Sequence, residues 1–245
     1  MSERIRLDLA LEQRKLLPSR ARARDAILRG TVTVNGVVAA KPHQMVAQSD
    51  VITLDDPASR YVSRAALKLI AGLDAGAIAV EGRTCLDVGS STGGFTQVLI
   101  ERGAAKVYAV DVGHDQLHER LRRNGKVVSL EGVNARDLDR AQIPDEIDLV
   151  VSDVSFVSVT KVLAAPLALS RPGADAVILI KPQFEVGREN IGKGGIVTDV
   201  AAIEKAVSDV IAFFAAEGWA HRLSVPSPIS GGDGNTETVA VFRRG

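Results

Sequence analysis

A glycine-rich turn between a predicted strand and a predicted helix is the feature that most constrains the fold of this chain. The run Asp87-Val-Gly-Ser-Ser-Thr-Gly-Gly-Phe95 follows the apolar Thr84-Cys-Leu86 and precedes Thr96-Gln-Val-Leu-Ile-Glu101. Glycines let the backbone approach a ligand closely, and the first turn of a helix offers free N–H groups. A short apolar strand, an acid, such a turn and then a helix are together typical of an α/β fold that holds a nucleotide-like cofactor.

The spacing of the glycines favours one cofactor over another. Gly89 is followed by Gly93 and Gly94, whereas the dinucleotide fingerprint is G-x-G-x-x-G. The form acid-Val-Gly-x-x-x-Gly-Gly suits S-adenosylmethionine better, because this cofactor has no pyrophosphate and its ammonium can use Asp87. An NAD-dependent oxidoreductase is therefore disfavoured. The structural alternative is an ordinary strand–helix turn that binds no ligand.

The composition allows one large domain, or a domain of ordinary size with a small appendage. Lys and Arg number 30, as do Asp and Glu, so the net charge is zero and only a local basic patch is possible. A single cysteine, Cys85, excludes an intrachain disulfide, and four scattered histidines give no metal-binding cluster. The charged N-terminus has no apolar signal region, and no apolar run has the length of a membrane helix. We therefore expect a cytoplasmic protein without a metal.

The first 56 residues are predicted to form a small separate α+β unit. Ser19 can cap a helix that Gly30 ends, and Asn35-Gly36 is a hairpin turn signal. The predicted elements are helices over 5–17 and 20–29 and short strands over 31–34, 37–38 and 51–54. The expected domain boundaries are 1–56 for this unit, 57–62 for a polar linker and 63–245 for the larger domain.

Positive charge is concentrated at the start of the chain. Residues 1–30 hold eight Lys and Arg and four acids, a balance of +4 against zero for the whole chain. Arg20 and Arg24 lie one helical turn apart and face the same way. A basic helix N-terminus beside a β-hairpin suits nucleic-acid phosphates, but on charge alone a solvated face is slightly the stronger interpretation.

From Arg60 onward, predicted strands alternate with predicted helices. Such alternation argues for a doubly wound, mostly parallel sheet in an α/β fold. The last two strands follow each other without a helix between them, so they can pair antiparallel at one edge. The predicted strands are 84–89, 106–112, 126–130, 147–153, 174–181, 219–225 and 237–243, and the predicted helices include 63–73, 94–102 and 199–217.

Polar residues follow the second and third of these strands, at the edge where the glycine-rich turn is expected. Asp111 ends the second strand and is placed to accept hydrogen bonds from ribose hydroxyls. Asn134 follows the third strand and can bind the adenine edge, with Asp137 as the second choice; a loop cap is the structural alternative. The predicted cofactor-binding residues are Asp87, Gly89, Ser91, Gly93, Gly94, Phe95, Asp111, Asn134 and Asp153.

Charged residues also follow the fourth and fifth strands. Asp153 ends one strand, and Lys181 directly follows the apolar run Ala176-Val-Ile-Leu-Ile180. Because a buried lysine is costly unless it is paired or neutral, Asp153 is the obvious partner of Lys181. Lys68, on the helix over 63–73, and Glu237, at the start of the last strand, can reach the same crevice. Taken singly, each of these two is more often a solvated surface charge.

These four residues carry a resemblance to a known family. Lys68, Asp153, Lys181 and Glu237, in that order around the glycine-rich turn, resemble the Lys-Asp-Lys-Glu tetrad of FtsJ-like ribose 2′-O-methyltransferases. The front unit is similar to the RNA-binding domain of ribosomal-protein-S-four type, and the junction resembles the TlyA family, which joins these two domains. The matching motifs are Leu16-Leu-Pro-Ser-Arg20, Ala26-Ile-Leu-Arg-Gly30, Val34-Asn-Gly36, Lys41-Pro42, Tyr61-Val-Ser-Arg64, Lys68-Leu69 and Lys181-Pro-Gln-Phe-Glu-Val-Gly187. One departure is Ala65-Ala66, where that family usually has one or two glycines.

The resemblance implies a ribosomal RNA (cytidine-2′-O-)-methyltransferase that uses S-adenosylmethionine. Lys181 is the implied base for the ribose hydroxyl, while Asp153 and Glu237 orient the two lysines. Shorter members of the family are associated with large-subunit RNA, so we expect a large-subunit cytidine as the target. The family's haemolysin label finds no support, because the sequence has no lytic amphipathic segment. The residues expected to contact ribosomal RNA are Arg4, Arg6, Arg20, Arg24, Lys41 and Arg64.

Two other classes of protein share part of this pattern. A small-molecule methyltransferase would have the same turn but would not need the basic front unit or two lysines. A non-catalytic RNA-binding or assembly factor would keep the front unit and could lose the tetrad, whereas all four positions are present here. The glycine-rich segment over 187–195 fits a loop that closes over RNA and fits a plain surface loop equally well.

Overall fold

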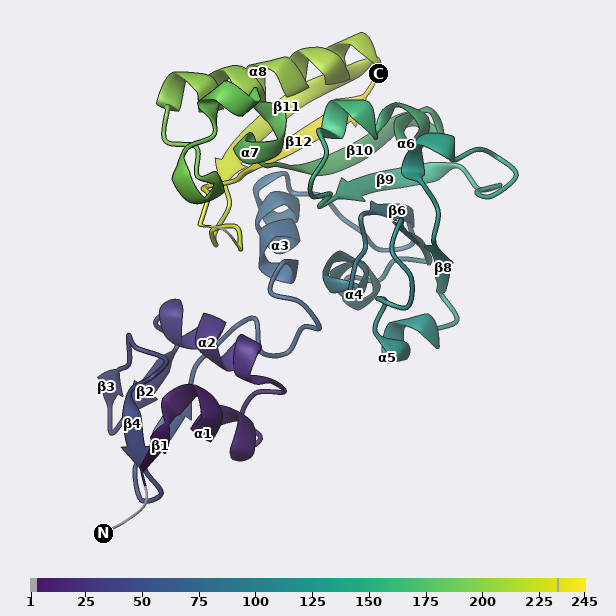
Figure 1. Ribbon diagram of the computed structural model, residues 1–245. Coiled ribbons are helices and arrows are strands. Elements are labelled where there is room, and N and C mark those ends of the chain that lie inside the picture. The colour runs from purple at the N-terminus through teal and green to yellow at the C-terminus, as the bar shows by residue number, and fades with distance from the viewer. Residues whose placement is uncertain (1–3, 233) are drawn as a thin grey trace. The chain divides into compact units, whose positions relative to one another are not determined.

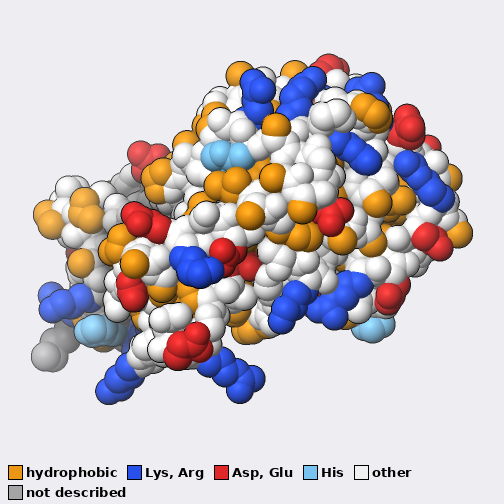
Figure 2. Space-filling model, turned by 90° about the horizontal axis from the view of Figure 1, so that it is seen from above, with side chains coloured by type: hydrophobic (Ala, Val, Ile, Leu, Met, Phe, Trp, Pro, Cys, Tyr) orange, Lys and Arg blue, Asp and Glu red, His pale blue; other side chains and the backbone are white. Residues whose placement is uncertain are grey.

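The computed structural model describes residues 4–232 and 234–245. The chain divides into two compact units, Met1–Arg60 and Tyr61–Gly245, each with its own hydrophobic core (Figure 1). On the face seen in Figure 2, Lys and Arg side chains are interspersed with Asp and Glu side chains.

The first unit packs two helices against short antiparallel strands. Strand β1 pairs with β4, and β2 pairs with both β3 and β5. Its fully buried core includes Leu7, Leu11, Ile27, Val32 and Val46. The elements are β1 (Arg4–Arg6), α1 (Leu7–Gln13), α2 (Arg20–Leu28), β2 (Val32–Val34), β3 (Val37–Val38), β4 (Met45–Ala47) and β5 (Ile52–Leu54).

The prediction of a single helix over 5–17 is wrong at both ends. Residues 4–6 form β1, and α1 ends at Gln13. The partner of β1, Met45–Ala47, lies about forty residues further along the chain. A strand of three residues is too short to show an alternating pattern, so only its distant partner defines it. The hairpin turn at Asn35 and Gly36 is confirmed, with φ of +51° and +81°.

The second unit is built on a seven-stranded sheet in the order β11-β12-β10-β9-β6-β7-β8. Strands β6 to β10 are parallel, while β12 is antiparallel to both β10 and β11. The predicted doubly wound, mostly parallel sheet with an antiparallel edge is confirmed. The strands are β6 (Thr84–Val88), β7 (Lys106–Asp111), β8 (Val127–Glu131), β9 (Ile147–Ser152), β10 (Ser170–Ile180), β11 (Trp219–Pro226) and β12 (Thr238–Arg244).

Helices cover the sheet and connect its strands. The α-helices are α3 (Ala66–Ala75), α4 (Gly94–Glu101), α5 (Glu119–Arg122), α6 (Ala164–Ala168), α7 (Pro182–Glu185) and α8 (Val200–Ala216). Short 3₁₀ turns occur at η1 (Ala135–Asp137), η2 (Val159–Lys161), η3 (Arg188–Asn190) and η4 (Lys193–Gly195). Strand β10 begins four residues before its predicted start, because it runs through Pro172 and Gly173 with a shift in its pairing to β9.

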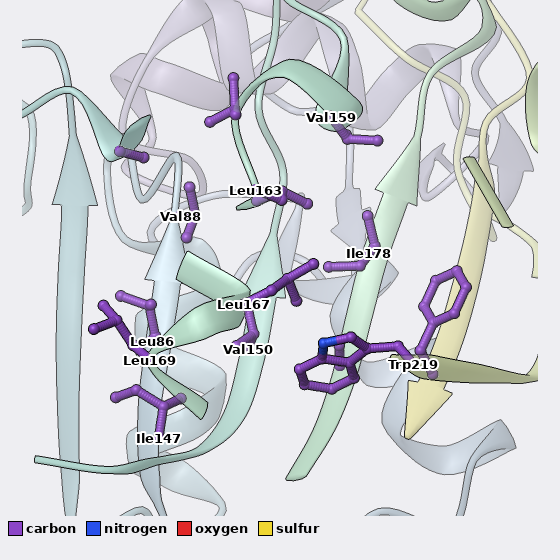
Figure 3. Close-up of a cluster of buried hydrophobic side chains, with 14 of the residues drawn as sticks. Leu86, Val88, Ile147, Val150, Val159, Leu163, Leu167, Leu169, Ile178 and Trp219 are labelled. Carbon is purple, nitrogen blue, oxygen red and sulfur yellow. The ribbon is translucent and has the colours of Figure 1, made fainter. Parts of the chain in front are cut away.

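The central strands of the sheet are buried on both faces, which explains their continuous apolar runs. On one face, Leu163 and Leu167 lie with Val150, Ile178 and Trp219 in a single cluster (Figure 3). On the other face, α3 packs against β10 and β12. Gly72 permits this close packing, since a Cβ there would lie 2.5 Å from Val177 Cγ1 and 2.6 Å from Val239 Cγ1.

The strand order decides which strand ends meet. Ser152 at the end of β9 pairs with Ile178 of β10, so Asp153 and Lys181 follow neighbouring parallel strands. Because β12 runs the other way, its first residue Thr238 pairs with Ile180 at the end of β10. Glu237, directly before β12, is therefore brought to the same edge as Lys181.

Candidate active site

The glycine-rich turn folds back over the ends of two strands. The N–H groups of Gly89 and Ser90 both donate to Val110 O, at 2.9 and 3.0 Å. Gly89 has φ of +82°, and a Cβ on it would lie 3.2 Å from backbone atoms of Val154. Only glycine meets both conditions without strain. Gly93, with φ of +96°, precedes α4, and a Cβ there would lie 2.3 Å from Leu121 Cδ1.

A cavity of about 600 Å³ opens beside this turn, at the carboxyl ends of β6, β7 and β9. Its polar wall includes Ser91, Asp111, Asn134 and Asp153, and its apolar wall is rich in valine. The Asp111 carboxylate accepts hydrogen bonds from the N–H groups of Ser91 and Gly113, each at 2.8 Å. These bonds fix the carboxylate at the cavity wall. The apolar lining comprises Val88, Val110, Val112, Val133, Ala135, Val154, Phe156, Val157 and Val162.

A second cavity of about 140 Å³ adjoins the first, since Gly89, Ser91, Asp153 and Ser155 line both. Of the predicted cofactor residues, Gly89, Ser91, Asp111, Asn134 and Asp153 line the larger cavity, and Gly94 and Phe95 line the smaller one. Asn134 Oδ1 also accepts from the Arg136 N–H at 3.1 Å, so the residue caps η1 as well. Within the described residues, Asp87, Gly93 and the second choice Asp137 line neither cavity.

Asp87 lies beneath the turn rather than in the cavity wall. Its side chain is fully buried, and its Oδ2 accepts a hydrogen bond from Thr96 Oγ1 at 2.6 Å. Burial raises the pKa of Asp87 to about 7, because the charged carboxylate is desolvated. In this structure the residue joins β6 to α4, and it has no direct contact with the cavity.

The four tetrad residues meet as two ion pairs. Lys68 Nζ on α3 lies 2.5 Å from Glu237 Oε2, and Lys181 Nζ lies 2.7 Å from Asp153 Oδ1. The side chains of Lys68, Glu237 and Lys181 are each less than a tenth exposed. Residues separated by as many as 169 positions are thus brought together by the strand order.

The two ion pairs are close enough to interact, because the Glu237 carboxyl is affected by the charges of both lysines. Burial raises the pKa of the Glu237 carboxyl, and the nearby positive charge of Lys68 and then that of Lys181 oppose the rise. Two cations and two anions therefore share one buried region, and each lysine has a carboxylate partner. This is the arrangement in which buried charges are tolerated.

Lys181 is also connected to the wall of both cavities. Its Nζ donates a hydrogen bond to Ser155 Oγ at 2.6 Å and lies 6.0 Å from the centroid of the Phe184 ring. Ser155 is exposed and lines both cavities, as does Asp153. The amine of Lys181 therefore lies directly behind the cavity wall.

Sequence reasoning missed two residues of this site. Ser155 and Phe156 follow Asp153 in the chain, but no pattern assigns a role to a serine or an exposed phenylalanine in a loop. Phe156 is 90% exposed, has φ of +66° and lines the larger cavity. Its ring centroid lies 5.4 Å from that of Phe184. An exposed ring on a strained backbone is a signal of function that only the structure reveals.

Several arginines of the first unit are bonded within it, including Arg6 and Arg20, which both bond to the Asp8 carboxylate. Arg14, Arg22 and Arg29 bond to backbone carbonyls or carboxylates of their own unit. The predicted RNA-contacting residues of this unit, Arg4, Arg6, Arg20, Arg24 and Lys41, keep at least part of their side chains at the surface. The sixth, Arg64, is partly buried in the second unit.

Two kinds of feature are missing from the part of the chain that the structure describes. No group of three or more His, Cys, Asp or Glu residues there could hold a metal ion. No helix there is both long and apolar enough to span a membrane.

Comparisons with known proteins agree with this architecture. Residues 61–244 match the family model of the FtsJ-like methyltransferases, and residues 5–52 match that of the S4 domain. The chain is 45% identical to the 16S/23S rRNA (cytidine-2′-O)-methyltransferase TlyA of Mycobacterium tuberculosis, over 99% of this chain and 91% of that protein. It is 42% identical to the 23S rRNA (cytidine-2′-O)-methyltransferase TlyA of Campylobacter jejuni, over 77% of this chain and 73% of that protein.

A solved structure extends the likeness to the whole fold. A candidate hemolysin from Streptococcus thermophilus superposes with a TM-score of 0.77 at 36% identity, over all of this chain and 90% of that one. Both units and the order in which they occur are therefore shared with this solved structure. The chain belongs to the TlyA family of FtsJ-like methyltransferases.

Proposed function

We propose that this protein transfers a methyl group from S-adenosylmethionine to the ribose 2′-hydroxyl of a cytidine in large-subunit ribosomal RNA. The observation that carries the proposal is the pair of buried ion pairs, Lys181–Asp153 and Lys68–Glu237, behind a cavity beside a glycine-rich turn. A methyltransferase that acts on a hydroxyl needs a base within reach of the cofactor, and this site supplies one.

The larger cavity suits the adenosine part of the cofactor. Its valine-rich wall fits an adenine ring, the Asp111 carboxylate can accept hydrogen bonds from ribose hydroxyls, and Asn134 offers an amide to the base edge. The positive φ of Gly89 lets the turn fold back beside this cavity, which Gly89 itself lines. When bound, S-adenosylmethionine supplies an electrophilic methyl group on its sulfonium.

In the proposed mechanism, Lys181 Nζ accepts the proton that the 2′-hydroxyl loses as it is methylated. The Lys181 ammonium must first release one proton to solvent, and the neutral amine that remains has two N–H bonds and one lone pair. Hydrogen bonds to Ser155 Oγ and to the backbone oxygen of Asp153 can hold the two N–H bonds, which leaves the lone pair for the hydroxyl. Lys68 and Glu237 fix the other side of the cluster. Alignment of these groups accounts for much of the rate of methyl transfer, since positioning the reactants lowers the activation barrier by several kcal/mol.

RNA recognition is assigned to the first unit and to the cavity mouth. The S4 match and the surface arginines support phosphate contacts by the domain expected over 1–56. The exposed ring of Phe156 offers a stacking surface for a base that has left its helix. The names of the M. tuberculosis and C. jejuni relatives support a cytidine of ribosomal RNA, and both include the 23S molecule. The proposed place of action is therefore the cytoplasm, with the ribosomal subunit or its RNA as partner.

The two competing classes are disfavoured by particular observations. A small-molecule methyltransferase would not need an S4 domain, whereas one matches residues 5–52. A non-catalytic assembly factor would not need two paired lysines behind the cofactor cavity.

Transfer of a labelled methyl group tests the proposal. Labelled S-adenosylmethionine is incubated with purified ribosomal subunits, and separately with naked ribosomal RNA, from a strain that lacks this protein. We expect label in large-subunit RNA with the wild type and none with Lys181→Ala, and nuclease mapping then gives the nucleotide. Absence of label from every RNA, with cofactor binding intact, would reject RNA methylation by this protein.

A further inference from the structure

One buried carboxylate in the first unit holds two arginines. Asp8, at the start of α1, is 2% exposed. It accepts hydrogen bonds from Arg6 Nε and Nη2 at 3.0 and 2.8 Å and from Arg20 Nε at 3.0 Å. Arg6 lies on β1 and Arg20 begins α2, so the carboxylate joins two elements that the chain places 14 residues apart. Both guanidinium groups contact the same oxygen, Oδ2, and therefore lie side by side.

These two arginines differ from the structural arginines of the same unit. The side chains of Arg6 and Arg20 are 43% and 54% exposed, whereas that of Arg29, bound to Asp56, is 16% exposed. Within residues 4–232 and 234–245, the two terminal amino groups of Arg20 have no hydrogen-bond partner. Each guanidinium carries five N–H donors, so most of these donors remain for a ligand.

Further positive charge lies beside the pair. The turn over 41–44 is bonded to the start of α1, through Leu7 N–H to Gln44 O and Asp8 N–H to Pro42 O, at 2.8 and 3.0 Å. Lys41 in that turn is exposed.

Hydrogen bonds from Arg6 and from Arg20 lower the pKa of Asp8 to about 2, so the carboxylate stays ionised throughout the neutral range.

We infer that Asp8 is a positioning residue, which holds Arg6 and Arg20 side by side so that their outward N–H groups bind one stretch of RNA backbone phosphate. The inference deepens the proposed function and rests on it. Guanidinium groups recognise phosphate oxygens through paired N–H bonds, so their orientation matters as well as their charge. Ordering two arginine side chains before binding removes an entropy cost that the RNA would otherwise have to offset.

The direction in which one substitution changes RNA affinity distinguishes this positioning role from simple electrostatic attraction. Asp8 with its two arginines carries a charge of +1, and Asp8→Asn raises it to +2. If attraction at a distance governed the contact, Asp8→Asn would tighten RNA binding. If Asp8 positions the arginines, the same substitution weakens binding despite the added positive charge.

A matched control variant distinguishes loss of arginine positioning by Asp8 from general destabilisation of the first unit. Asp56 is a second buried carboxylate of the same unit, and it binds Arg29 at 2.8 and 2.7 Å. Asp56→Asn breaks a comparable ion pair in which the arginine is covered. We expect both variants to lower thermal stability, but only Asp8→Asn to change RNA affinity.

The experiment measures binding of naked large-subunit ribosomal RNA to the full chain at several salt concentrations. For Asp8→Asn we expect affinity about tenfold lower at each salt concentration, with the slope of log affinity against log salt retained, because both arginines keep their charge. For Arg20→Ala we expect a slope smaller by about 1. Unchanged or tighter binding by Asp8→Asn, or an equal loss with Asp56→Asn, would overturn the positioning role. Failure of the wild type to bind RNA would instead count against the proposed function itself.

Discussion

Lys181 and Asp153 form an ion pair at the ends of neighbouring parallel strands, with 2.7 Å between Nζ and Oδ1. Neither residue is near the other in the chain, and β9 and β10 bring them together. Ser155, two residues after Asp153, accepts a hydrogen bond from the same amine. The lysine is thereby oriented by groups that also line the proposed cofactor cavity.

Replacement of this lysine tests its role as the base. Lys181→Ala is expected to lower kcat for methyl transfer by at least about a hundredfold, the usual contribution of a positioned base. Affinity for S-adenosylmethionine should stay within about twofold, because Lys181 is not among the described residues that line either cavity. Single-turnover assays and calorimetric titration measure the two quantities. Lys205→Ala, on the exposed face of α8, is the control and should change neither.

Gly72 is predicted to control the position of Lys68, which lies one turn earlier on α3. An added Cβ would meet Val177 and Val239, so Gly72→Ala should push α3 away from the sheet and separate Lys68 from Glu237. We expect a loss of about 1–3 kcal/mol in the free energy of unfolding and a fall in kcat. Urea unfolding and methyl transfer are the measurements. Gly125→Ala, where a Cβ meets open space, should change neither the free energy of unfolding nor kcat. Equal effects of the two substitutions would contradict the role of Gly72 in positioning Lys68.

The ring of Phe156 is expected to contribute to RNA binding rather than to folding. Phe156→Ala should weaken productive RNA binding by about 1–3 kcal/mol, the usual value of one base–aromatic stack. Stability should be retained, since the side chain is 90% exposed. Phe156→Tyr keeps a ring and should restore most of the activity. A rise in KM for RNA with the alanine variant alone would support stacking of a base on the Phe156 ring. An unchanged KM would contradict it.

Because the buried carboxyl of Asp87 has a raised pKa, we expect the free energy of unfolding to depend on pH. Its pKa in the folded protein is about 7, above the ordinary value of 3.8, so the folded state binds the proton more tightly than the unfolded state. The resulting stability is fully present below about pH 4 and is lost as pH rises through about 7, at a slope of up to about 1.4 kcal/mol per pH unit. Urea unfolding at pH 5 and pH 8 should show wild type losing stability relative to Asp87→Asn. Parallel pH profiles for the two proteins would refute the assignment.

Much of the fold was predictable because its signals are local. Alternation of apolar runs and helical spacing indicated the strands and helices of the second unit, and the glycine-rich turn indicated where we propose that a cofactor binds. Gly89 illustrates the reason: its positive φ and its contact with Val154 make glycine necessary, so the residue type itself carries the information. Asp153 and Lys181 were also indicated locally, since charged residues at the ends of apolar strands are costly without a partner. Lys68 and Glu237 were added to the predicted tetrad only through the resemblance to the FtsJ-like methyltransferases.

Other features depend on partners that are distant in the chain. Strands β1 and β4 have three residues each, and only their pairing across about forty positions defines them. Asp87 stays a predicted cofactor residue, and only the structure shows that the packing of α4 on β6 buries its side chain beneath the turn. The shared carboxylate of Asp8 was also invisible in the sequence, because β1 and α2 meet only in the folded unit.

The amino-acid sequence by itself determined most strands and helices of the second unit, where the backbone must bend, and that Asp153, Lys181 and Glu237 stand at strand ends. Only the tertiary structure decided which charges pair. Because β12 runs antiparallel to β10, Thr238 lies opposite Ile180, and Glu237 reaches Lys68 on α3 rather than solvent. Residue type and spacing are properties of a short window of chain, whereas strand order and register depend on the packing of the whole sheet against its helices.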